Sequence, residues 1–160
     1  MKEPYIMSEN EMLLDQYKLY VEMADRVSAR RAQTNRFYIA LLTALLLILS
    51  AVGDKNLFLN YQLPVFIIVS LLGIALNYVW YINIKSYRQL NTGKFEIIQQ
   101  MEEKLPFHCY TDEWKLLGEG KDSEKYRQLT KIESDVPKIM VIPYVLLFMY
   151  SVTMFFVRIV

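Results

Sequence analysis

Histidine and cysteine are almost absent from this chain of 160 residues. One histidine and one cysteine exclude an intrachain disulfide and a metal site built from several histidines. His108 and Cys109 are adjacent, and neighbouring side chains of an extended loop point to opposite sides, so they make a poor nucleophile and base. The chain also has no glycine-rich phosphate loop, no G-x-S-x-G and no H-E-x-x-H. We therefore expect no enzymatic activity, no cofactor and no bound metal.

An excess of charge of one sign is also lacking. The polar segments 1–36 and 85–138 each contain as many acids as bases, whereas a nucleic-acid interface is distinctly basic. No nucleic-acid partner is therefore expected. A cation could be ligated by the oxygens of four clustered acids, Glu102, Glu103, Asp112 and Glu113. A solvated, charge-balanced surface is the favoured interpretation of this cluster.

Uncharged apolar sequence is what the chain has in abundance. Three long blocks contain a single charged residue between them, Arg158 near the end of the last. About 20 residues of helix cross a hydrocarbon core, whereas three strands cannot close into a barrel. The sequence therefore predicts an all-α membrane protein with three transmembrane helices. The predicted segments are a cytoplasmic helix at 1–36, spans at 37–53, 63–84 and 139–160, an external loop at 54–62 and a cytoplasmic helical region at 85–138.

Basic residues flank these blocks on one side. Four arginines precede the first span, Lys85 and Arg88 follow the second, and Lys131 and Lys138 precede the third. Because Lys and Arg are retained in the cytoplasm, the N-terminus is predicted to be cytoplasmic and the C-terminus external. An aromatic belt at the inner end of span two is predicted from three residues, Tyr78, Trp80 and Tyr81.

The N-terminal segment predicts one long helix that continues into the first span. Ser8 and Glu11 form a capping box, and neither glycine nor proline occurs between Tyr5 and Val52. At about 1.5 Å per residue such a helix is roughly 65 Å long. Its amphipathic part must pack on the membrane surface, on the later cytoplasmic helices or on copies of itself. The seam for that contact has heptad spacing: Leu14, Tyr17, Val21, Ala24, Ser28, Arg31 and Asn35.

The segment 85–138 predicts shorter elements. The helix of span two is expected to run to about Leu90 and to be interrupted at Gly93. A helix at 94–105 should end before Pro106, and 107–122 reads as an ordered loop anchored by Tyr110 and Trp114. A last cytoplasmic helix is expected over 123–135, before Pro137, and Pro143 is expected to kink span three.

Uncharged polar residues inside the spans are candidates for helix packing. Thr43 and Asn77 are expected at similar depth, and Asn77 is predicted to contact Thr43 or a copy of itself. Packing within a protomer is the favoured interpretation, and a pore lining is the alternative. The second polar layer comprises Ser50, Ser70 and Ser151.

Arg30 and Arg31 also allow two interpretations. They could anchor the chain at lipid phosphates, or they could form a polar clasp with Glu133 or Asp135. Reversing the charge of Arg31 and then of Glu133 would distinguish the two, since only a clasp would be restored by the second change.

Four stretches carry a resemblance to a known family: YKLYVEMADRVSARRAQTNRFYIALLTALL, NIKSYRQLNTGKFEIIQQMEEKLP, YTDEWKLLGEG and KYRQLTKIESDVPKI. The chain resembles the RipA family of octameric membrane proteins, small proteins of the bacterial inner membrane. This resemblance implies an eight-fold assembly and no established enzymatic activity. A looser likeness is to the SLATT membrane effectors of prokaryotic defence systems, which also place a helix before a hairpin of spans. Within the stretches the residues that carry the resemblance are Tyr17, Arg30, Arg31, Asn35, Leu90, Asn91, Lys94, Phe95, Glu102, Leu105, Pro106, Trp114, Glu133 and Pro137.

The sequence and the resemblance together favour a self-associating assembly in the bacterial inner (plasma) membrane. The number of copies is implied by the resemblance alone: we expect a homo-octamer that contacts the lipid bilayer and binds a cytoplasmic protein partner through its cytoplasmic helices. A channel-like or membrane-permeabilising effector is the alternative. The residues expected to carry packing or assembly are Tyr17, Val21, Ala24, Ser28, Arg30, Arg31, Asn35, Thr43, Asn77, Trp114 and Glu133.

Overall fold

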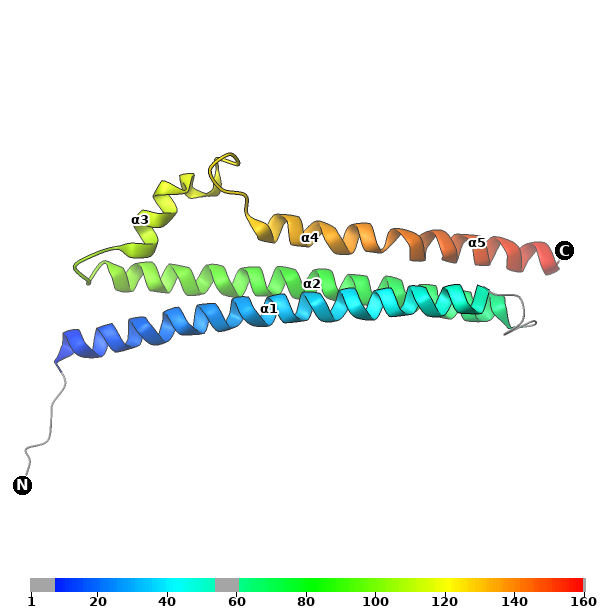
Figure 1. Ribbon diagram of the computed structural model, residues 1–160, viewed down its shortest axis with the longest axis horizontal. Helices are drawn as coiled ribbons and strands as arrows, with labels where there is room; N and C mark the ends of the chain where they lie inside the picture. Colours follow the sequence, from blue (N-terminus) through cyan, green and yellow to red (C-terminus); the bar gives the residue numbers. More distant parts are fainter. Residues whose placement is uncertain (1–7, 54–60, 160) are drawn as a thin grey trace, which may run out of the picture. The chain divides into compact units, whose positions relative to one another are not determined.

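The computed structural model describes residues 8–53 and 61–159, and all regular structure in this part of the chain is helical. Most of the predicted external loop, 54–62, lies outside the described residues. Figure 1 shows the elements in chain order. They are α1 (Glu9–Gly53), α2 (Gln62–Glu102), α3 (Cys109–Leu116), the 3-10 turn η1 (Gly118–Gly120), α4 (Leu129–Met140) and α5 (Ile142–Ile159).

Three helical stretches are long and apolar enough to cross a membrane, which confirms the predicted number of spans. They lie within Glu9–Gly53, Gln62–Glu102 and Lys131–Arg158. The last of these combines α4 and α5. Only a helix can cross the bilayer as a single segment, because all its backbone hydrogen bonds are internal and the lipid tails offer no partners.

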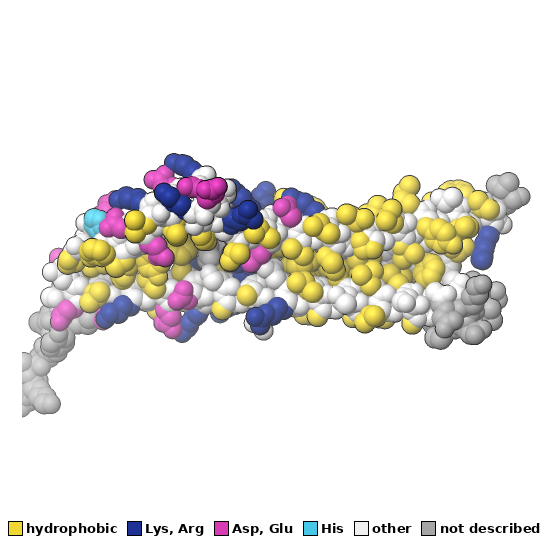
Figure 2. Space-filling view, turned by 45° about the horizontal axis from the view of Figure 1, so that its top comes forward, with side chains coloured by type: hydrophobic (Ala, Val, Ile, Leu, Met, Phe, Trp, Pro, Cys, Tyr) yellow, Lys and Arg dark blue, Asp and Glu magenta, His cyan; other side chains and the backbone are white. Residues whose placement is uncertain are grey.

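The helices are distributed over two compact units. Unit 1 contains α1 up to Arg31 together with Tyr87–Leu129, and unit 2 contains Ala32–Ser86 together with the residues from Thr130 onward. Both long helices therefore contribute to both units. On the face shown in Figure 2, charged side chains gather over α3 and the residues that follow it in unit 1, whereas hydrophobic side chains cover unit 2.

α1 begins as its capping box predicts. The amide of Ser8 donates to Oε2 of Glu11 at 2.8 Å, and the amide of Glu11 donates to Oγ of Ser8 at 3.3 Å. These reciprocal bonds satisfy two of the amides that a helix start leaves without partners. The helix then continues for 45 residues, as expected of a stretch without proline or internal glycine.

α2 differs from its prediction because it passes through Gly93 without interruption. A lone glycine costs a helix only about 1 kcal/mol, and residues on both sides of it are held against α1. Asn91 donates to Oγ of Ser28 at 3.1 Å, and the ammonium of Lys94 lies 5.2 Å from the ring centroid of Tyr20. The helix ends at Glu102, three residues before the predicted end.

Three further predictions for the segment before span three were wrong. The expected loop at 107–122 contains α3, the expected helix at 123–135 begins only at Leu129, and α4 includes Pro137. Proline removes one backbone donor, and the chain continues past it because the amide of Val141 donates to the carbonyl of Pro137 at 3.0 Å. The helix is interrupted between Met140, the end of α4, and Ile142, the start of α5, so the break lies just before the kink predicted at Pro143. Pro143 itself lies in the first turn of α5, where a proline is tolerated.

The core of unit 2 is formed by side chains from all three spans. Leu42 and Leu49 come from α1, Trp80 and Ile84 from α2, and Tyr144 from α5. In unit 1 the buried side chains are fewer: Ala24, Val27, Ile98 and the carboxylate of Glu102. This buried charge is the most unusual feature of unit 1.

Candidate functional site

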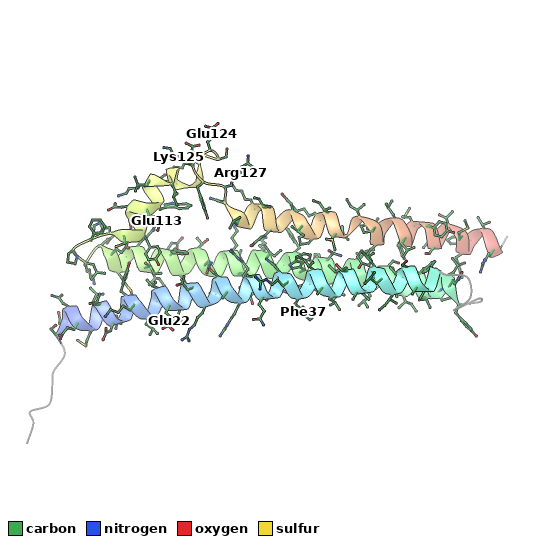
Figure 3. All side chains as sticks on the ribbon, in the orientation of Figure 1. Glu22, Phe37, Glu113, Glu124, Lys125 and Arg127 are labelled. Atoms are coloured by element: carbon green, nitrogen blue, oxygen red, sulfur yellow. The ribbon has the colours of Figure 1, made fainter. Side chains whose placement is uncertain are left out.

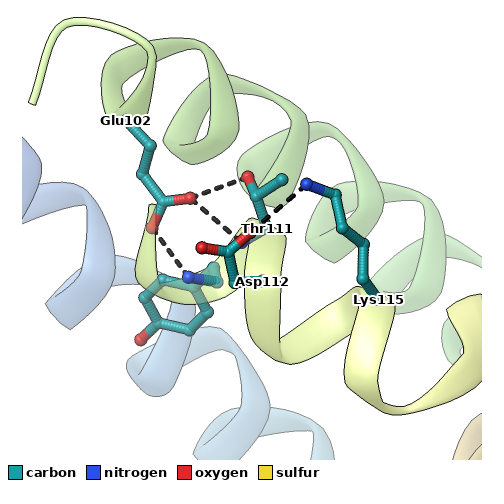
Figure 4. A network of polar contacts seen from close by, with 5 residues as sticks. Glu102, Thr111, Asp112 and Lys115 are labelled. Carbon is teal, nitrogen blue, oxygen red and sulfur yellow. Dashed lines mark hydrogen bonds and ion pairs between the residues drawn. The ribbon is translucent and has the colours of Figure 1, made fainter. Parts of the chain in front are cut away.

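The carboxylate of Glu102 is fully buried and accepts four hydrogen bonds. Those that come from the start of α3 are drawn in Figure 4. Oε1 accepts from the hydroxyl of Tyr17 at 3.0 Å and from the amide of Tyr110 at 2.8 Å. Oε2 accepts from the amide of Thr111 at 3.0 Å and from its hydroxyl at 2.8 Å. The last residue of α2 therefore joins the first turn of α3 to the middle of the polar half of α1.

Glu102 acts as the N-terminal cap of α3. His108 occupies the cap position of this helix, but its side chain makes no capping bond. The carboxylate of Glu102 instead receives two of the amides that the helix start leaves without partners, and a negative charge is favourable at this end of the helix dipole. A residue seven positions upstream of Cys109 thus provides what the local sequence lacks.

Hydrogen bonding keeps this buried carboxyl ionised. Burial alone would raise the pKa of Glu102, but donation from Tyr110 and Thr111 outweighs burial and holds the pKa below its ordinary value. Burial, and then the bond to Glu102, raise the pKa of Tyr17, so its phenol remains a donor. Both residues lie outside the predicted spans. The prediction that Glu102 belongs to a solvated acidic surface was wrong.

From Tyr17 to Ser28 the heptad seam of α1 packs against α2 inside unit 1, whereas Leu14, the first residue of the predicted seam, is exposed. Tyr17 contacts Glu102, Ser28 accepts from Asn91, and Ala24 is buried between these two levels. Of the three contacts that were possible for this amphipathic stretch, the structure shows the one with the later helices of the same chain. Two of the polar residues at the end of the seam make specific hydrogen bonds instead of apolar contacts: Ser28 accepts from Asn91, and Asn35 accepts from Trp80.

In unit 2, Tyr144 locks the three spans together. Its hydroxyl donates to the backbone carbonyl of Leu42 in α1 at 2.6 Å, and its ring lies on Gly73 of α2. A Cβ at Gly73 would overlap the Tyr144 ring, so only glycine leaves room for it. Small residues allow such close approach between helices in membranes, where packing replaces the hydrophobic effect as the source of stability.

Trp80 makes a second connection between spans, which corrects its predicted place in an aromatic belt. Its Nε1 donates to Oδ1 of Asn35 at 2.8 Å, and its ring stacks on that of Tyr38 at a centroid distance of 5.8 Å. Only 1% of Trp80 is exposed. Tyr78 and Tyr81, the other two members of the predicted belt, are exposed.

The buried polar residues inside the spans donate hydrogen bonds within their own helices. Nδ2 of Asn77 donates to the carbonyl of Gly73 at 2.8 Å, and the hydroxyls of Ser70 and Ser151 donate to carbonyls three or four residues earlier. Oδ1 of Asn77 is also buried but accepts no hydrogen bond from the described residues. Thr43 is exposed, and among the described residues no hydrogen bond joins it to Asn77. The predicted Asn77–Thr43 contact is therefore not a hydrogen bond in this structure.

The remaining candidates are more accessible. Val21 is half-buried, Arg30 is exposed, and Trp114 packs edge-on against Tyr126 at a centroid distance of 6.3 Å. A clasp between Arg31 and Glu133 stays a prediction. Figure 3 shows charged side chains pointing outward from the segment around α3, among them the labelled Glu113, Glu124, Lys125 and Arg127.

No cation site is built by the part of the chain that the structure describes. No group of three or more His, Cys, Asp or Glu side chains there is arranged to hold a metal ion. Of the clustered acids, Glu102 binds the start of α3 and Asp112 pairs with Lys115 at 3.2 Å. The notable geometry is thus that of helix-to-helix connection in each unit.

A known protein family matches most of the chain. The model of the octameric membrane protein family (8xMP) matches residues 14–153, which extend from α1 into α5. The chain belongs to this family. No curated protein and no solved structure matches it. Both the Glu102 cap and the Tyr144 lock of this octameric-family protein fall inside the matched stretch.

Proposed function

We propose that this protein is a self-assembling homo-octamer of the bacterial inner membrane and acts as a structural and interaction assembly without a catalytic step. Unit 1 lies in the cytoplasm in this proposal, and the C-terminus lies outside. The octameric family supports self-assembly, and the apolar length of the three helices supports membrane insertion. The helices of unit 1 would contact neighbouring copies and a cytoplasmic protein partner.

One observation carries the assembly proposal: α1 keeps an apolar stripe exposed in unit 1. Met12, Leu19 and Met23 are 45%, 55% and 38% exposed although they precede the first apolar block by at least 14 residues. Spacings of seven and four place them on one helix face. The opposite seam is already used against α2, so this stripe is free to contact another copy. An exposed apolar patch outside the membrane indicates a protein–protein contact.

A polar-lined pore is less well supported by the same structure. A conduction path needs polar or charged groups along its wall, and Ser70, Asn77 and Ser151 are buried within unit 2. Thr43 and Ser50 are the polar candidates that remain exposed. We therefore expect purified protein in liposomes to give no ion flux above that of empty liposomes in a fluorescence assay. Reproducible flux would favour the channel alternative.

Mass determination of the detergent-solubilised complex tests the assembly. We expect eight times the chain mass of 19.0 kDa by light scattering with correction for detergent. Leu19→Lys should produce smaller species, because a charge in a packed apolar contact is costly. Ala29→Lys is the matched control at an exposed position away from the stripe, and it should leave the mass unchanged. A monomeric parent protein would contradict the proposal.

A further inference from the structure

Exposed cations from three helices gather at one end of unit 2. Arg36 on α1, Lys85 on α2 and Lys138 on α4 are all exposed, and we call these three residues the basic belt. A hydrogen bond and a cation–π contact between the helices fix their levels. Trp80 binds Asn35, the residue before Arg36, and Lys138 lies 5.7 Å from the ring centroid of Tyr81. Lys85 is one helical turn beyond Tyr81.

Acids at this end of unit 2 do not balance the bases. Lys131 adds a fourth exposed base, while the described part of unit 2 contains two acids, Glu133 and Asp135. Asp135 pairs with Lys138 at 2.8 Å, so each offsets the other, and the four bases and two acids together leave a net charge of +2. Towards the other end, the described residues of unit 2 contain one base, Arg158, and no acid. The electrostatic potential of unit 2 is therefore positive at the end that carries the basic belt.

Exposed aromatic and aliphatic side chains lie beside the basic belt. Phe37, which follows Arg36 and projects from α1 in Figure 3, is 59% exposed, and Tyr78 is 66% exposed. Ile82, on the same helix as Lys85, is 45% exposed. A phosphate at the belt would thus have apolar surface directly next to it, which is the arrangement of charge and hydrocarbon in a phospholipid.

We propose that the basic belt binds the phosphate headgroups of anionic phospholipids and so gives the protein a preference for such lipids. The adjacent exposed apolar side chains favour a lipid over free phosphate, because only a lipid has acyl chains to lie against them. This inference concerns the surface of one chain and does not depend on the number of copies or on the orientation proposed above. The lipid proposal is therefore tested independently of the assembly proposal.

Lipid selectivity measured by electron spin resonance tests the proposal. Full-length protein is reconstituted in phosphatidylcholine bilayers with spin-labelled phosphatidylglycerol or spin-labelled phosphatidylcholine, and the motionally restricted fractions are compared. A charged headgroup beside one base of the belt gains roughly 1 kcal/mol, so the parent protein should prefer phosphatidylglycerol by about five-fold. The variant Arg36→Gln/Lys85→Gln/Lys138→Gln should show about equal fractions. Equal fractions for the parent protein would overturn the proposal.

A matched variant controls for the loss of charge. Lys18→Gln/Lys115→Gln/Lys121→Gln removes three exposed bases of unit 1, each of which pairs with an acid. It should keep the preference, and its loss would overturn the assignment to the basic belt.

Inorganic phosphate, compared with chloride at equal ionic strength, should not reduce the preference of the parent protein. Specific competition by phosphate would show a free-anion site and contradict the lipid proposal. Unchanged elution and thermal stability of both variants establish that each is folded.

Discussion

Glu102→Ala is expected to release α3 from the rest of unit 1. The change leaves the amides of Tyr110 and Thr111 and two hydroxyl groups without their shared acceptor. Buried donors that lose a partner, together with a lost helix cap, cost on the order of 3 kcal/mol. Amide hydrogen exchange across Cys109–Leu116 should therefore accelerate by about a hundred-fold. Mass spectrometry of the exchanged protein, digested after quenching, measures this directly.

Two variants sharpen this test. Glu102→Gln keeps the size of the side chain but replaces one acceptor oxygen by a donor, so exchange in α3 should accelerate by an intermediate amount. Glu103→Gln is the control, because Glu103 is the exposed neighbour and should leave exchange unchanged. If α3 in Glu102→Ala exchanged at the parent rate, the carboxylate would not be what holds the helix.

The same carboxylate gives α3 a specific pH dependence. The folded pKa of Glu102 lies below its ordinary value of 4.5, so its contribution to stability is present above that value and is lost as the pH falls through the lower, folded pKa. Protection of α3, corrected for intrinsic exchange, should thus be constant from neutral pH down to about pH 5 and decline as the pH falls from the ordinary value of 4.5 towards the lower, folded pKa. A decline between pH 7 and pH 5 would contradict the assigned role.

Much of the helical structure could be predicted because it is determined by residues within the same segment of the chain. The apolar length of each block predicts a span, and the absence of glycine and proline together with Ser8 and Glu11 predicts where α1 begins and that it continues. α3 could not be predicted in this way, since its cap is supplied by Glu102 from another helix. Gly93 was misread for the same reason: contacts with α1 outweigh a small local penalty.

The roles of single residues were harder to predict, although one periodic signal was available. Glu102 lies four residues after Ile98, on the face of α2 that is buried in unit 1, so its position indicated burial more strongly than its charge indicated exposure. Trp80 similarly lies four residues before Ile84 and is buried with it. The partner of Tyr144, by contrast, is a backbone carbonyl, and no side-chain pattern in a sequence identifies such an acceptor.

Gly73→Ala is expected to separate span three from the other two spans. The added methyl group would overlap the ring of Tyr144, and this residue cannot move away without losing its bond to the carbonyl of Leu42. Overpacking of this kind costs about 1–3 kcal/mol, and the lost hydrogen bond adds about 1 kcal/mol. Unfolding in increasing sodium dodecyl sulfate measures the loss. It is followed by the fluorescence of Trp80 in detergent-solubilised protein whose other tryptophan is replaced, Trp114→Phe.

Gly93→Ala provides a control with the opposite expected sign. Nothing lies within 4 Å of a Cβ at this helical position, so alanine should stabilise the helix by up to about 1 kcal/mol through its higher helix propensity.

The double variant Gly73→Ala/Tyr144→Leu identifies the cause of the loss in Gly73→Ala, because the smaller side chain makes room for the methyl group. It should be no less stable than Tyr144→Leu alone, whereas independent effects would add. Additive losses would mean that Gly73 is required for some reason other than the close approach of Tyr144, and the lock between the spans would have to be assigned to other contacts.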